Sequence, residues 1–90
     1  MGRPDLRLRR DRPQRSRSER ERELIDALVD AYVDWREEAA ATELAYRAWG
    51  DAAGADKALA FAAYLTALDR EEYAADCYAT AVADYRWARR

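Results

Sequence analysis

The chain has 90 residues, with 16 basic and 18 acidic side chains and a formal net charge of -2, so it forms one domain at most. It contains no histidine, one cysteine and three glycines. These counts exclude a histidine general base, a cysteine-based zinc site and a glycine-rich phosphate-binding loop. We therefore expect no enzyme activity, no metal and no cofactor.

The composition also bears on the cellular setting. No stretch approaches the roughly 18 apolar residues that a membrane-spanning helix needs. Residues 1–17 lack the apolar region of a secretory signal, and a single cysteine excludes an internal disulfide framework. The sequence predicts a cytoplasmic protein without membrane association.

The first segment, residues 1–17, carries seven arginines and two aspartates, a net charge of +5. Residues 18–90 carry nine basic and sixteen acidic groups, a net charge of -7. Because the segment has too few apolar side chains to offset the entropy of ordering, we predict a disordered arm ahead of one helical domain, residues 18–90. The arginines of this arm are Arg3, Arg7, Arg9, Arg10, Arg12, Arg15 and Arg17.

This arm supports an alternative function, that of a nucleic-acid-associated accessory protein. Its guanidinium groups could neutralise phosphates, with binding that weakens steeply as salt rises. It has no aromatic side chain to stack on bases, so sequence reading is not indicated. A solvated tail, a misassigned start, the codon usage of a GC-rich genome and contact with the acidic body of the same chain are the other interpretations.

A helix is predicted over residues 18–49. Two capping-box patterns, Ser16 with Glu19 and Ser18 with Glu21, mark its start, and no glycine or proline interrupts it. Its apolar positions recur in alternating steps of three and four, the spacing of a coiled coil. They are Ile25, Leu28, Tyr32, Trp35, Ala39, Thr42, Tyr46 and Trp49, widened on one side by Leu24, Ala31 and Ala45.

Residues 50–54 predict a turn. Gly50 suits a left-handed helix end, and Asp56 or Asp51 suits the start of the next helix. That helix is predicted over residues 56–88, with a possible break near Asp69, which begins another capping pattern. Its apolar side holds Phe61, Tyr64, Leu65, Leu68, Ala75, Tyr78, Ala79, Val82 and Tyr85.

Two stretches of similar length joined by a short loop predict an all-α antiparallel hairpin. With the turn centred on Ala52, residue i faces residue 104 minus i. This register places Ala39 opposite Leu65 and Asp34 opposite Arg70.

One hairpin offers a single buried seam, and the apolar stripe is wider than that seam. We therefore expect two copies to pair into a four-helix bundle, or a helical partner protein to cover the stripe. The leading hypothesis is a non-enzymatic protein–protein interaction or oligomerisation module. Its predicted helix-packing seam is Ile25, Leu28, Tyr32, Trp35, Ala39, Tyr46, Trp49, Phe61, Leu65, Leu68, Ala75 and Val82.

Other polar groups have structural interpretations. Di-metal sites of helical bundles use inward Glu-x-x-His pairs, whereas the aspartate row Asp26, Asp30 and Asp34 faces outward. Of Glu71 and Glu72, one must approach the seam, as a register-setting group or as a partner of Tyr32 or Arg36. Cys77 is predicted to be a packed thiol, because no histidine can activate it.

The hairpin resembles in architecture the small helical substrates of type VII secretion, with Trp49-Gly50 in place of their Trp-x-Gly turn. The intervening residue is absent. The family's Tyr-x-x-x-Asp/Glu export signal is absent as well, so the resemblance assigns no site residues. Four residues after Tyr73, Tyr78 and Tyr85 stand Cys77, Val82 and Arg89.

Overall fold

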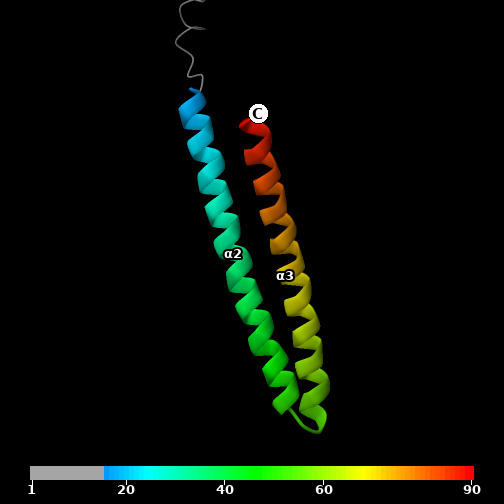
Figure 1. Ribbon diagram of the computed structural model, residues 1–90. Helices are drawn as coiled ribbons and strands as arrows, with labels where there is room; N and C mark the ends of the chain where they lie inside the picture. Colours follow the sequence, from blue (N-terminus) through cyan, green and yellow to red (C-terminus); the bar gives the residue numbers. More distant parts are fainter. Residues whose placement is uncertain (1–15) are drawn as a thin grey trace, which may run out of the picture.

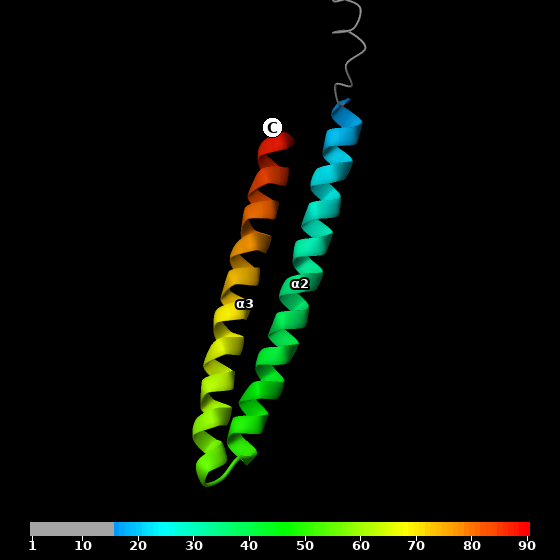
Figure 2. The ribbon, with the colours of Figure 1, turned by 180° about the vertical axis from the view of Figure 1, so that it is seen from behind.

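The computed structural model describes residues 16–90, which form two helices joined by a short loop (Figure 1). Helix α2 spans Arg17–Asp51 and helix α3 spans Ala55–Ala88. The helices lie side by side and antiparallel in both views, so the start of α2 and the end of α3 share one end of the hairpin (Figures 1 and 2). The predicted all-α hairpin is confirmed. Helix α3 runs through Asp69 without a break.

The first of the two predicted capping boxes starts α2. The backbone N–H of Glu19 donates to the hydroxyl of Ser16 at 3.0 Å, and the N–H of Ser16 donates to the Glu19 carboxylate at 3.2 Å. These two bonds satisfy N–H groups that a helix start leaves without partners. Helix α2 therefore begins at Arg17, which belongs to the helix and not to the arm.

The turn differs from its prediction. Helix α2 continues through Gly50 to Asp51, and the chain leaves it at Ala52 in an extended conformation, with φ -75° and ψ 152°. Gly50 is therefore no left-handed helix end. The left-handed residue is Gly54, with φ +62°, which precedes α3 and reverses the chain. A residue without a Cβ adopts this conformation at little cost.

Side chains near the turn also act differently from the prediction. No side chain caps the start of α3, so neither Asp51 nor Asp56 has that role. Asp56 lies in the first turn of α3, where the helix dipole favours a negative charge. The ammonium of Lys57 reaches back to the carbonyl oxygens of Trp49 and Ala52, at 3.4 and 3.5 Å, and so covers the end of α2.

Each helix contributes two rows of buried or half-buried residues to the seam between the helices, and each row repeats every seven residues. The α2 row through Leu28 and Trp35 was predicted to lie in the seam. Leu24, Ala31 and Ala45 of the second α2 row were predicted only to widen the apolar stripe. The rows of α2 are Leu28, Trp35, Thr42 and Trp49, and Leu24, Ala31, Glu38 and Ala45. The rows of α3 are Tyr64, Glu71, Tyr78 and Tyr85, and Ala60, Ala67, Ala74 and Ala81.

Much of the predicted seam therefore lies along one side of the seam, although the rings of Tyr32, Tyr46 and Phe61 still contact rings of the facing helix. The alanine rows let the two helices approach closely, and the larger side chains of the adjacent row are left on one side of the pair. The displaced residues are the exposed Ile25, Tyr32, Tyr46, Phe61, Leu65 and Leu68 and the half-buried Ala39, Ala75 and Val82.

The predicted register is wrong by about six residues. Trp49 contacts Phe61 and Tyr46 contacts Tyr64, so residue i meets a residue near 110 minus i. The loop between Asp51 and Ala55 lies later in the chain than assumed. Side chains also lean toward the start of their own helix, which points those of α2 away from the turn and those of α3 toward it.

The corrected register changes the predicted pairs. Ala39 does not face Leu65, and Arg70 pairs with Glu38 at 3.5 Å in place of Asp34. At the open end of the hairpin, Arg89 forms an ion pair with Glu21 at 2.6 Å. The hairpin is therefore bridged by charge at its middle and at its open end.

Candidate interaction surface

Aromatic side chains hold the seam together in two clusters. In the first, Trp35 stacks on Tyr78 with ring centroids 5.4 Å apart and an interplanar angle of 14°. In the second, Trp49 stacks on Tyr64 at 5.5 Å and 16°. Each cluster also takes in a tyrosine of the adjacent row, Tyr32 or Tyr46.

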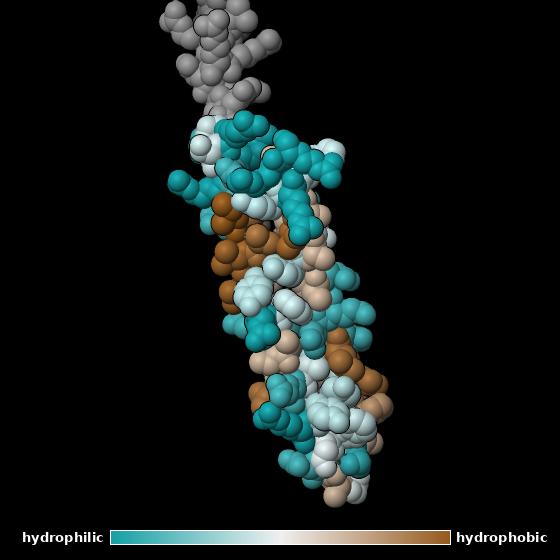
Figure 3. Space-filling view, viewed as in Figure 1, coloured by the Kyte–Doolittle hydropathy of each residue, from teal (hydrophilic) through white to brown (hydrophobic). Residues whose placement is uncertain are grey.

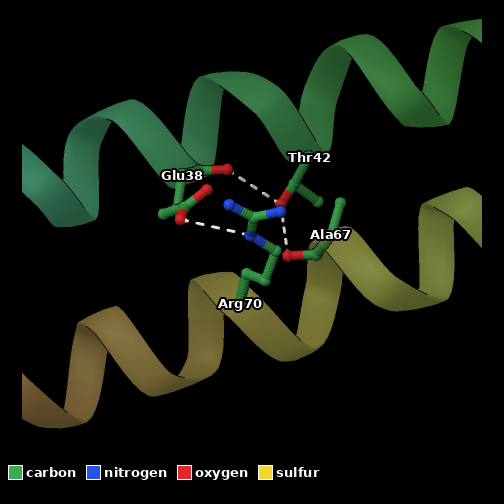
Figure 4. A network of polar contacts seen from close by, with 4 residues as sticks. All are labelled: Glu38, Thr42, Ala67 and Arg70. Carbon is green, nitrogen blue, oxygen red and sulfur yellow. Dashed lines mark hydrogen bonds and ion pairs between the residues drawn. The ribbon is translucent and has the colours of Figure 1, made fainter.

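Between the clusters the helices come into polar contact, shown in Figure 4. The Thr42 hydroxyl donates toward two carbonyl oxygens, that of Glu38 on its own helix at 2.9 Å and that of Ala67 on α3 at 3.1 Å. Thr42 is 8% exposed and Ala74 is 7% exposed, and both are small. Within residues 16–90, no large side chain is fully buried. The hairpin has a seam but no core.

One side of the hairpin is an apolar face. In antiparallel helices, residues one position after the alanine-bearing rows turn toward the same side of the pair. Figure 3 shows this side, with hydrophobic patches over the first half of α2 and over the part of α3 that follows the turn. The apolar face consists of Ile25, Val29, Tyr32, Ala39, Tyr46, Phe61, Leu65, Leu68, Ala75 and Val82.

The large side chains of this face are open to solvent. Their exposed fractions range from 37% for Leu68 to 55% for Tyr46. Arg36 and Glu43 of α2 and Glu72 of α3 follow the same helical rows and lie at its outer edges. Seven large apolar side chains on one side of the hairpin are thus open to solvent.

The opposite side is acidic. A groove of about 880 Å³ runs along the alanine-bearing side of the seam, with Ala27, Ala31 and Ala74 in its lining. Its charged residues are Asp30, Asp34, Glu37, Glu38, Asp69 and Arg70. The aspartates Asp26, Asp30 and Asp34 are exposed, as predicted. Like charges make this side a poor surface for pairing with its own copy.

Two further predictions can be placed. Glu71 lies half-buried in the seam row between Tyr64 and Tyr78, while Glu72 is exposed, so one glutamate does approach the seam. The prediction for Cys77 is wrong, since its thiol is exposed. Cys77 raises the pKa of Tyr73 above its ordinary value, first through a side-chain hydrogen bond and then through the negative charge of its sulfur when ionised.

Arg89 is the other group with a displaced pKa. Its pKa is raised, first by the charge of Tyr85 and then by the hydrogen bond and charge of Glu21. The shift favours the charged guanidinium that bridges the open end of the hairpin.

The predicted nucleic-acid arm lies outside the described residues apart from Arg17, which is exposed at the start of α2. Residues 16–90 contain no group of three or more acidic or cysteine side chains arranged to hold a metal ion. Neither α2 nor α3 combines the length and apolar character needed to cross a membrane.

No protein-family model matches the chain, and neither the curated proteins nor the solved structures yield a match. The architectural resemblance to type VII secretion substrates included a turn at Trp49-Gly50. Both residues lie inside α2, so the turn does not occur at Trp49-Gly50.

An apolar stripe wider than the seam was expected from the sequence, but its composition was not. The missed signal is the recurrence of Ala60, Ala67, Ala74 and Ala81 at intervals of seven. Such a row lets two helices approach closely and so displaces the neighbouring large residues to the surface.

Proposed function

We propose that the protein is a non-enzymatic helical interaction module, and that two copies pair through the apolar face into a four-helix bundle. The observation that carries the proposal is the exposure of this face, because its large side chains are 37% to 55% exposed while no large side chain in residues 16–90 is fully buried.

The physical reason is that stable domains bury apolar surface between two layers of secondary structure. Two helices bury one stripe each against the other, and here alanine makes up one full row of the α3 stripe and half of one row of the α2 stripe. A second hairpin laid on the apolar face would supply the missing layer, as in four-helix bundles. A second copy brings the same surface, and a two-fold axis makes such a contact self-complementary.

The acidic side remains on the outside of this bundle. Its net negative charge discourages further stacking of copies and leaves Asp30, Asp34 and Glu37 open to a partner protein. The proposed module thus has one side for self-association and one for a different protein.

Sedimentation equilibrium over a range of protein concentrations tests the proposal. The wild type should sediment at twice the mass of the 10.4 kDa chain. The variant Leu65→Glu, on the apolar face, should sediment as a monomer with reduced helicity, because a carboxylate would be placed in the dimer interface.

The matched control is Leu59→Glu. Leu59 is also on α3 and is 73% exposed against 45% for Leu65, but it is not part of the apolar face. It should leave the dimer intact. A wild type that is a stable, folded monomer at micromolar concentration would overturn the proposal.

A further inference from the structure

We infer that the two hairpins of the dimer lie with their turns at the same end of the bundle. The inference rests on the proposed pairing through the apolar face. A two-fold axis allows two arrangements of this pair. An axis along the helices lays α2 over α3 of the second copy, with both turns at one end. An axis across the helices lays α2 over α2 and α3 over α3, with the turns at opposite ends.

The charges at the edges of the apolar face distinguish the two arrangements. Arg36 on α2 and Glu72 on α3 fit the relation of residue i to residue 108 minus i. Glu38 and Arg70 fit the same relation, and they bridge the helices at 3.5 Å. Arg36 and Glu72 therefore lie within about one helical turn of the same height along the hairpin, each on the outer edge of its helix.

In the same-end arrangement, height is preserved between the copies. The outer edge of α2 then lies over the outer edge of α3 of the second copy, which places Arg36 against Glu72 of the second copy. Symmetry repeats this ion pair on the other edge.

In the opposite-end arrangement, the same residues meet like charges. Arg36 and Glu72 lie close to the middles of Arg17–Asp51 and Ala55–Ala88. Full overlap of two inverted hairpins therefore brings Arg36 near Arg36 of the second copy and Glu72 near Glu72 of the second copy. Like charges facing each other across an interface disfavour that partner geometry.

Packing volumes do not separate the arrangements. Tyr32 meets Ala75 of the second copy when the turns share one end, and Ala39 of the second copy when they do not. Leu68 likewise meets Ala39 or Ala75. Both arrangements set large side chains against small ones, so the edge charges decide.

Distances between spin labels on full-length protein test the inference. The label is attached at Ala53→Cys, in the exposed turn, after Cys77→Ser removes the exposed native thiol. Turns at the same end should give a label-to-label distance below about 30 Å, since packed helices lie about 8–10 Å apart. A distance near 50 Å, the length of a 35-residue helix, would overturn the inference.

A label at Asp34→Cys, near the middle of α2, is the matched control. It should give a measurable distance in either arrangement and so reports pairing alone. If neither label gives a dipolar signal and the labelled protein sediments as a monomer, the proposed pairing fails, and this inference fails with it. An opposite-end distance with a normal Asp34 control overturns this inference only.

Charge reversal provides a second measurement. Arg36→Glu and Glu72→Arg should each weaken dimerisation about tenfold, because each replaces two attractive contacts by repulsive ones. The double variant should restore the wild-type dissociation constant. In the opposite-end arrangement each single variant keeps like charges facing each other, so unchanged single variants would contradict the inference.

Discussion

The hydroxyl of Thr42 lies 3.1 Å from the carbonyl oxygen of Ala67 on the facing helix. This contact joins the helices between the two aromatic clusters, at a point where both helices present small residues. Beside this contact, Glu38 of α2 forms an ion pair with Arg70 of α3. The middle of the seam is therefore set by close backbone approach and by polar contacts, and not by large apolar side chains.

Two substitutions at Thr42 separate these contributions. Thr42→Val keeps the shape and removes the hydroxyl; both carbonyl oxygens retain their helical partners, so the free energy of unfolding should fall by no more than about 1 kcal/mol. Thr42→Leu adds volume to a closely packed point and should cost about 1–3 kcal/mol. Urea denaturation at one fixed protein concentration measures both. Equal stability of the Leu variant and the wild type would show that close approach at this point is not a constraint.

The second prediction concerns the aromatic cluster near the turn. Trp49 contacts Tyr46, Phe61 and Tyr64, and it is half-buried. Trp49→Ala should therefore lower the free energy of unfolding by about 2 kcal/mol, less than for a fully buried tryptophan. Thermal denaturation followed by circular dichroism measures this.

Trp87→Ala is the control for this change. Trp87 is 71% exposed and contacts the guanidinium of Arg90, with 4.9 Å between the guanidinium carbon and the ring centroid. Its loss should alter stability by no more than about 0.5 kcal/mol. Equal losses for the two tryptophans would mean that the cluster at Trp49 contributes nothing beyond ordinary surface contact.

The helix start provides the third prediction. Ser16→Ala removes the hydroxyl that accepts from the Glu19 N–H, and this should cost about 1 kcal/mol. Ser18→Ala is the matched control, since Ser18 belongs to the capping pattern that the chain does not use. It lies exposed inside α2 and should have little effect. A larger loss for Ser18→Ala than for Ser16→Ala would place the start of α2 two residues later.

Some of this structure follows directly from the sequence. The sequence predicted both helices, the capping box at Ser16 and the hairpin. It also predicted the seam row of α2 that passes through Trp35 and Trp49. Each rests on local chemistry or on unbroken heptad spacing, which neighbouring elements do not alter. The sequence left a break near Asp69 open, and the structure shows α3 continuous through that residue.

The second row of the seam could not be chosen from spacing alone. The rows through Ala31 and Tyr32 both recur every seven residues, and size favours the tyrosine row. The facing helix decides between them, because its alanines at Ala67 and Ala74 bring the helices close together and leave the tyrosine row at one side of the seam. The register likewise depends on where Gly54 reverses the chain and on the direction in which side chains lean along each helix. The spacing of apolar residues predicts neither of these.

The final prediction concerns Tyr73 and Cys77, one turn apart on the exposed side of α3. The hydrogen bond to Cys77, followed by the negative charge of the Cys77 sulfur when ionised, raises the pKa of Tyr73 above its ordinary value of 10.0. The folded protein thus holds the phenol proton more tightly than the unfolded chain does. This contribution to stability is fully present below pH 10 and is lost as pH rises through the raised pKa. Cys77→Ala should shift part of the tyrosinate absorbance change to lower pH in a spectrophotometric titration. The same substitution in a Tyr73→Phe background should shift nothing, and a shift that persists there would assign the coupling to a different tyrosine.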